Sequence, residues 1–136
     1  MLSLSRAPIW FFAVAIWFAA LFLLSSQSDL APPGPQFENR DKVLHATYFA
    51  MGATCLFVAL RLSNPTRSVW KTSLIVFLCC TAIGVTDEFH QSFVPHRSGN
   101  DLGDLLADAF GGILGCGFGT FFYRIFRPKT SASEHV

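Results

Sequence analysis

Four long apolar runs dominate this sequence, and each is long enough to cross the hydrocarbon core of a membrane. They cover about 7–24, 43–60, 69–86 and 105–126. A single run inside lipid satisfies its backbone hydrogen bonds only as a helix. The sequence therefore predicts an all-α membrane protein with four transmembrane helices, built as one domain over residues 1–136.

Composition agrees with a membrane domain and excludes some partners. Apolar residues make up 51% of the chain and charged residues 14%, against about 25% charged in soluble proteins. A net charge of +1 argues against a nucleic-acid partner, which would need a clustered basic face. The four cysteines lie inside the apolar runs without metal-ligand spacing, so we expect membrane-buried apolar side chains there.

The two ends of the chain need separate interpretation. Arg6 before the first run also fits a cleaved signal peptide. However, the run is longer than the usual apolar core of a signal peptide, and no small-x-small cleavage site follows it. We therefore expect a retained helix. Residues 129–136 are polar and are expected to form a disordered tail.

Basic residues predict the orientation, because cytoplasmic loops carry more Lys and Arg than loops on the other side. With both termini cytoplasmic, the outer segments hold only Arg40, Lys42 and Arg97. The inner segments hold the remaining basic residues: Arg6, Arg61, Arg67, Lys71, Arg124, Arg127 and Lys129. Nearly all the acids fall on the outer side, although acids have little weight in orientation. We interpret this as a polar site facing the extracytoplasmic side of a plasma (inner) membrane.

Helical spacing predicts that the polar residues converge. Asp41, His45 and Tyr48 stand at i, i+4 and i+7, so they share one face of the second helix. Asp87 and Gln91 share a face if the third helix continues one turn beyond its apolar run. Ionisable groups this close to hydrocarbon are costly, which makes them site candidates.

The fourth helix carries acids and small residues on the same stripe. Asp104 and Asp108 lie four residues apart, and Gly111, Gly115 and Gly119 continue their face. Such small-xxx-small spacing lets another helix approach closely. We therefore expect the carboxylates to point into the bundle, and the glycines to seat either a neighbouring helix or a helix of a partner protein.

The loop over 93–103 has the parts of an anion clamp. Arg97 is a planar, permanently charged donor, and Ser98-Gly99-Asn100 favours a sharp backbone turn. Asp101 is placed to cap the following helix. His90 and His96 are expected to be solvated loop residues.

These motifs together resemble the VanZ-like family of small integral membrane proteins, which is named for a protein linked to teicoplanin resistance. The resemblance covers about residues 41–126, and one departure is His96, where a glycine is expected before the arginine. It implies a multi-span cell-envelope protein, without a settled biochemical activity. The matching motifs are Asp41-Lys42-x-x-His45-x-x-Tyr48, Asp87-Glu88-x-x-Gln91-x-Phe93-x-Pro95-x-Arg97, and Asp104-x-x-x-Asp108 leading into Gly111.

The candidate reacting groups are His45, Glu88, Asp104 and Asp108. His45 suits proton transfer, and the three acids are candidate ligands of a divalent metal ion. The structural alternatives are a buried histidine bonded to Asp41 or Tyr48, helix capping with an ion pair to Arg97 or Lys42, and a hydrogen-bonded network that fixes helix register. The candidate substrate contacts are Lys42, Arg97, Tyr48, Gln91, Asp41 and Asp87.

Three functions compete at this stage. The first is binding or processing of an anionic envelope lipid or cell-wall precursor, including metal-assisted hydrolysis or transfer on a lipid-linked substrate. The second is a non-enzymatic scaffold or accessory subunit whose polar cluster is structural. The third is a small transporter, which is disfavoured because no charged residue lies near the middle of a span. Membrane lipids are the expected partners in each case.

Overall fold

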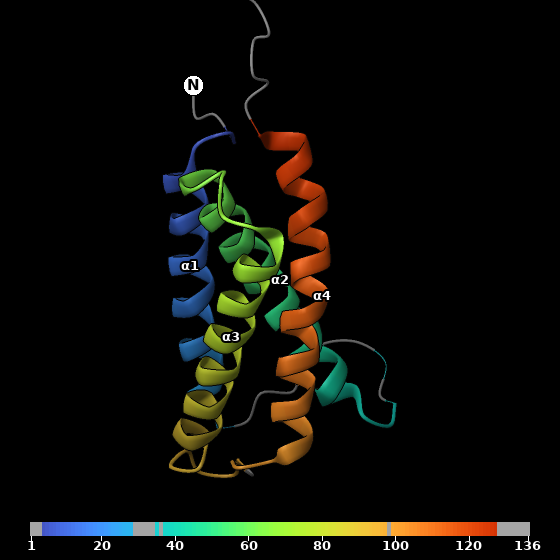
Figure 1. The fold of residues 1–136 in the computed structure, drawn as a ribbon. Coiled ribbons are helices and arrows are strands. Elements are labelled where there is room, and N and C mark those ends of the chain that lie inside the picture. Colours follow the sequence, from blue (N-terminus) through green and yellow to red (C-terminus); the bar gives the residue numbers. More distant parts are fainter. Residues whose placement is uncertain (1–3, 29–34, 36, 98, 128–136) are drawn as a thin grey trace, which may run out of the picture.

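Four antiparallel helices form the fold in the computed structural model, which describes residues 4–28, 35, 37–97 and 99–127 (Figure 1). The predicted tail, 129–136, lies outside the described residues. Each helix has the length and apolar composition of a membrane span, and the described residues contain no strand. This confirms the prediction of an all-α protein with four candidate spans. The helices are α1 (Ala7–Ser25), α2 (Arg40–Ser63), α3 (Val69–Gln91) and α4 (Leu102–Phe126).

At one end of the bundle the helices extend beyond the predicted apolar runs. α2 begins at Arg40, α3 continues to Gln91, and α4 begins at Leu102. The side chain of Asp101 caps α4 by accepting a hydrogen bond from the Gly103 N–H at 2.7 Å, as the sequence predicted. We call this the polar end: the last residues of α1 and α3 and the first residues of α2 and α4. The opposite end holds the start of α1 and the end of α4 (Figure 1).

The glycine stripe of α4 packs against α2 of the same chain. A β-carbon added at Gly115 would lie 2.6 Å from the carbonyl oxygen of Ala50, and one at Gly119 would lie 2.6 Å from the β-carbon of Phe57. Gly111 approaches the α2 backbone just as closely. The predicted close approach is therefore present, and the neighbour is α2, with which α4 makes the most extensive helix contact in the fold.

Adding one methyl group to this stripe is expected to weaken the bundle. Gly115→Ala should lower the free energy of unfolding by about 1–2 kcal/mol, because α2 and α4 must separate to admit the methyl group. Gly117→Ala is the matched control, since a β-carbon there meets no atom within 4 Å. Denaturant titration in detergent measures the free energy of unfolding of both variants. Equal stability of the two variants would contradict the packing.

Helix α1 docks on α2 through two reciprocal hydrogen bonds. The Trp17 indole N–H donates to the Tyr48 carbonyl oxygen at 2.9 Å, and the Tyr48 hydroxyl donates to the Trp17 carbonyl oxygen at 3.2 Å. The indole ring is buried over Gly52, where any side chain would overlap it. These bonds anchor the middle of α1 to α2, and Tyr48 also lines the pocket described below.

Candidate functional site

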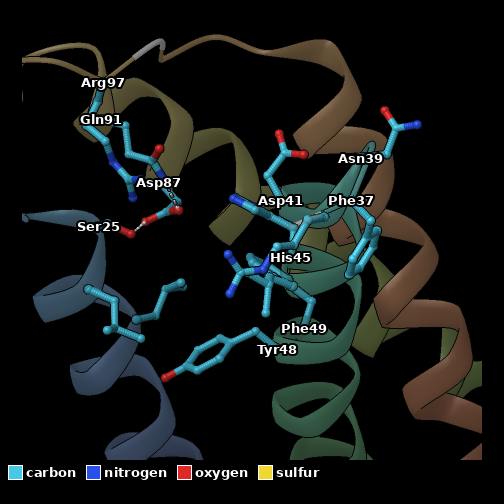
Figure 2. Close-up of a pocket in the computed structure, with 14 residues that line it drawn as sticks. Ser25, Phe37, Asn39, Asp41, His45, Tyr48, Phe49, Asp87, Gln91 and Arg97 are labelled. Carbon is cyan, nitrogen blue, oxygen red and sulfur yellow. Dashed lines mark hydrogen bonds between the residues drawn. The ribbon is translucent and has the colours of Figure 1, made fainter. Parts of the chain in front are cut away.

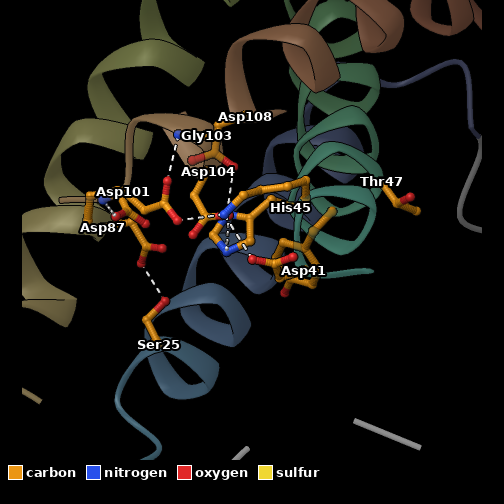
Figure 3. A network of polar contacts seen from close by, with 12 residues as sticks. Ser25, Asp41, His45, Thr47, Asp87, Asp101, Gly103, Asp104 and Asp108 are labelled. Carbon is orange, nitrogen blue, oxygen red and sulfur yellow. Dashed lines mark hydrogen bonds and ion pairs between the residues drawn. The ribbon is translucent and has the colours of Figure 1, made fainter. Parts of the chain in front are cut away.

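An acid cluster lies at the polar end, where α2, α3 and α4 meet (Figure 3). Its carboxylates come from all three helices and the α4 cap, and most are buried or half-buried. One lysine and one histidine from α2 reach into them. The acid cluster consists of Asp41, Glu88, Asp101, Asp104 and Asp108.

Lys42 joins three of these carboxylates. Its ammonium group donates to Asp41 at 2.9 Å, to Asp101 at 2.6 Å and to Asp104 at 2.9 Å. An ammonium group has three N–H donors, so all of them are used. The hydrogen bond from Lys42 holds the pKa of the Asp101 carboxyl below its usual value. Lys42 thus neutralises the outer part of the cluster.

His45 and Asp108 form the deepest ionisable pair. The His45 Nδ1 atom lies 2.9 Å from Asp108 Oδ1, and the Asp108 side chain is fully buried. The other ring nitrogen, Nε2, lies 3.9 Å from Asp104 Oδ1, beyond hydrogen-bond distance. Asp108 fits because α3 places Gly84 opposite it: a β-carbon there would lie 2.8 Å from Asp108 Oδ2. An imidazole whose Nδ1–H donates to Asp108 leaves Nε2 with its lone pair toward Asp104.

Glu88 is the member of the acid cluster that comes from α3. Its Oε2 accepts the Asp101 backbone N–H at 2.7 Å, which ties α3 to the start of α4. Its Oε1 is buried and has no hydrogen-bond partner among the described residues, and the same is true of Asp108 Oδ2. Buried acceptors without a partner are uncommon, so these two oxygens require an explanation.

Asp87 links α3 to α1 rather than to the acid cluster. It accepts a hydrogen bond from the Ser25 hydroxyl and another from the Gln91 amide at 2.8 Å. All three side chains are buried. The predicted common face of Asp87 and Gln91 is confirmed, because α3 does continue beyond its apolar run.

A pocket of about 630 Å³ opens beside the acid cluster, between α1, α2 and α3 (Figure 2). Its walls are mainly apolar, and its polar groups come from the ends of the helices and the two loops at this end. Asp41 belongs to both the pocket wall and the acid cluster, and His45, in the pocket wall, bonds to Asp108 of the cluster. The lining residues are Leu21, Leu24, Ser25, Phe37, Asn39, Arg40, Asp41, Leu44, His45, Tyr48, Phe49, Asp87, Gln91 and Arg97.

Arg97 reaches the pocket from the loop between α3 and α4. Its Nε atom is buried and has no hydrogen-bond partner among the described residues. The preceding residue, His96, has a φ of 64°, the left-handed conformation that favours glycine. The glycine that the family resemblance led us to expect at this position would adopt this conformation without strain. At Gly99 a β-carbon would overlap the backbone of Ser92, so the loop folds tightly back onto the end of α3.

The structure brings most of the predicted site residues together, in two groups. Tyr48, Gln91, Asp41, Asp87 and Arg97 line the pocket, as does His45. Lys42 lies instead among the carboxylates. Of the predicted metal ligands, Glu88 and Asp104 have donor atoms within 4.8 Å of one another and of a His45 ring nitrogen, whereas Asp108 is bonded to His45. Ser98, in the predicted anion clamp, lies outside the described residues.

Sequence reasoning missed the contribution of α1. Ser25 is buried against Asp87, yet its position after an apolar run suggested only a helix end. His90 was expected in a solvated loop, and this was wrong: it lies on α3, with Nε2 3.1 Å from the Ser26 hydroxyl oxygen and its ring against Phe22. Arg40, next to Asp41, also lines the pocket. The only available signal was the cluster of polar residues directly after the first run.

A bundle of four apolar helices with ionisable side chains gathered at one end defines a small multi-pass membrane protein with a buried polar site. The chain belongs to the VanZ/LLP1 family, whose family model matches residues 9–127. The match extends well beyond the motifs and includes most of α1. Comparisons with curated proteins and with solved structures gave no match.

Proposed function

We propose that this VanZ-family protein binds an anionic amphiphile of the cell envelope, such as a lipid-linked phosphate or cell-wall precursor, in the pocket between α1, α2 and α3. The observation that carries the proposal is the pairing of a mostly apolar pocket with an arginine whose buried Nε has no partner among the described residues. A pocket of about 630 Å³ is within the range of sites that enclose small ligands, about 300–1,000 Å³.

The two kinds of lining residue suit the two parts of an amphiphile. Leu21, Leu24, Leu44 and Phe49 supply apolar lining and would contact an acyl or prenyl chain. Arg97 lies at the polar end and would contact the charged head (Figure 2). A guanidinium group suits a phosphate or carboxylate because its N–H groups can donate two parallel hydrogen bonds.

His45 is the side chain in the pocket wall that is suited to proton transfer. Asp108 fixes the ring through Nδ1, which leaves Nε2 as the free nitrogen. A histidine held in this way is suited to accept a proton from, or return one to, a bound headgroup or a water molecule. Hydrolysis or transfer at the headgroup is therefore the reaction class that this site would support, with His45 as the proton-transfer group.

The distribution of charge supports a site on the extracytoplasmic side of the plasma membrane. The polar end carries Arg40, Lys42 and Arg97, whereas the other described basic residues lie near the opposite end: Arg6, Arg61, Arg67, Lys71, Arg124 and Arg127. Positive residues favour the cytoplasmic side. The polar end would then face outward, where mature envelope lipids and precursors are exposed.

Removing Arg97 is expected to lower the retention of anionic lipid. Native mass spectrometry of the protein in mixed phosphatidylglycerol and phosphatidylcholine should show preferential retention of phosphatidylglycerol. Arg97→Ala should reduce this preference about tenfold, the effect of losing one charge-assisted hydrogen bond. Arg97→Lys should recover part of it.

Arg124→Ala is the matched control, because Arg124 is exposed near the opposite end of α4. It should retain phosphatidylglycerol as the wild type does. Equal loss in both arginine variants would show that general surface charge causes the preference for phosphatidylglycerol. No preference in the wild type would contradict the proposal.

A scaffold function is favoured by a different observation. The Ser25–Asp87 hydrogen bond, like those between Trp17 and Tyr48, fastens one helix to another. If wild-type protein retains no lipid, and variants of the polar end lose only stability, then the polar end serves to hold the bundle together.

A further inference from the structure

We propose that the acid cluster holds one divalent transition-metal ion, with His45, Glu88 and Asp104 as its ligands. Each residue comes from a different helix: α2, α3 and α4 respectively. A His45 ring nitrogen and one carboxylate oxygen from each acid all lie within 4.8 Å of one another. The inference deepens the proposed function, because His45 also lines the lipid pocket. With the ion bound, His45 Nε2 is a ligand, and the ion replaces the imidazole as the reacting group at the headgroup.

The distances fit an ion with short bonds. An ion bound at about 2.0–2.2 Å from each donor atom holds neighbouring ligand atoms roughly 3–4 Å apart. The 3.9 Å between His45 Nε2 and Asp104 Oδ1 is within this range, although it is too long for a hydrogen bond between them. Only small side-chain shifts would complete the site.

Glu88 gives an independent indication that a ligand is needed. Its side chain is only 4% exposed, and its Oε1 has no hydrogen-bond partner among the described residues. The other oxygen is held by the Asp101 N–H, which fixes the direction of the carboxylate. A buried carboxylate oxygen without a donor is costly. A cation bound between Glu88, Asp104 and His45 would remove that cost.

Asp108 would support the site without touching the ion. It accepts the hydrogen bond of His45 Nδ1, so Nε2 is the nitrogen available for coordination. Histidines that bind metals commonly donate their second nitrogen to a carboxylate, which fixes the tautomer and raises the basicity of the ligand. This arrangement also accounts for a fully buried acid one turn deeper than Asp104.

The charge of the cluster favours a cation. Five carboxylates gather here around a single lysine and one histidine. Lys42 serves the outer members, Asp41, Asp101 and Asp104, whereas Glu88 and Asp108 have no lysine or arginine partner among the described side chains. The inner half is therefore where additional positive charge is needed.

A second group of acids at this end is a poorer site. Asp41, Asp101 and Asp104 also have oxygens within 4.8 Å of one another, but all three are bonded to the ammonium group of Lys42. The group contains no imidazole, and Asp41 is exposed. One nitrogen and two carboxylate ligands suit Zn²⁺ or Mn²⁺ better than Mg²⁺ or Ca²⁺, which prefer oxygen ligands alone. Three protein ligands would leave positions for water or a phosphate oxygen.

The test uses Mn²⁺ alone, added to chelator-stripped protein in detergent and followed by electron paramagnetic resonance. Electron spin echo modulation of wild-type protein should show one coordinated imidazole nitrogen, which His45→Gln removes. Glu88→Gln should weaken Mn²⁺ binding at least tenfold. Asp108→Asn should weaken it about 10- to 100-fold through the lost support of His45.

Asp41→Asn is the control that separates the two acid groups, and it should change Mn²⁺ affinity less than twofold. Weakening by Asp41→Asn as large as that by Glu88→Gln would place the ion in the Lys42 group. Unchanged binding in Glu88→Gln, or no nitrogen signal in the wild type, would overturn the proposal. Arg97→Ala should keep full Mn²⁺ affinity, so a failure of the lipid proposal would be distinguishable from a failure of this one.

Discussion

Replacing His45 with leucine is expected to lower the free energy of unfolding by about 3 kcal/mol, because the buried Asp108 carboxylate loses its hydrogen-bond donor. Asp108 is fully buried, and His45 Nδ1, at 2.9 Å, is its hydrogen-bond donor. Leucine fills similar space but leaves the carboxylate without a donor. Unfolding in detergent with a chelator present measures the loss free of any bound metal.

A double-mutant cycle isolates the interaction energy between His45 and Asp108 from the other effects of each substitution. Asp108→Leu alone should also destabilise, because the His45 nitrogen then loses its acceptor. The double variant His45→Leu/Asp108→Leu should be more stable than the sum of the single losses predicts, by about 1–3 kcal/mol of coupling. Strictly additive losses would contradict a direct bond between the two side chains.

Replacing Asp87 with alanine is expected to cost about 2–3 kcal/mol, because two buried donors lose their common acceptor. The Ser25 hydroxyl and the Gln91 amide both donate to Asp87, and all three groups are buried. The Ser25 bond also joins α1 to α3, which otherwise make few contacts. Limited proteolysis should therefore show faster cleavage near the end of α1, in parallel with the fall in stability.

Two other substitutions should lower the free energy of unfolding by less than Asp87→Ala does. Ser25→Ala should cost about 1 kcal/mol, since Asp87 keeps the Gln91 bond and only one donor is removed. Asp41→Asn should cost less still, because Asp41 is exposed and shares Lys42 with two other acids. A cost for Asp87→Ala no larger than that for Asp41→Asn would show that the α1–α3 bond contributes little.

The four helices were predictable because a single apolar run inside lipid can satisfy its backbone hydrogen bonds only as a helix. Apart from the Asp101 cap of α4, their ends were not predictable, because helix ends depend on side-chain partners. α3 continues through Glu88 and Gln91 because each polar group there has a hydrogen-bond partner: the Asp101 N–H for Glu88, and Asp87, on α3 itself, for Gln91. The partner of Glu88 comes from the following loop, which helical spacing could not identify.

The convergence of the candidate site was also predictable, but its internal pairing was not. Helical spacing placed Asp104 and Asp108 on the packing face of α4, and the glycines below them confirm that face. Spacing cannot specify which of several acids a given donor reaches. Lys42 bonds to Asp41, Asp101 and Asp104, and His45 bonds to Asp108. The position of α2 along α4 and its rotation against it determine which side chains come within hydrogen-bond distance. The role of Ser25 depends on how α1 docks, which its uniformly apolar sequence does not encode.

The packing of α2 against α4 brings His45 and Asp108 into direct contact inside the bundle, and the whole site depends on this contact. Solid-state NMR of protein in lipid bilayers, with nitrogen-labelled histidine and carboxyl-labelled aspartate, measures this contact. The His45 ring nitrogen should show dipolar coupling to an aspartate carboxyl carbon, and Asp108→Asn should abolish most of it. Absence of that coupling in the wild-type protein, or its survival unchanged in Asp108→Asn, would contradict the account.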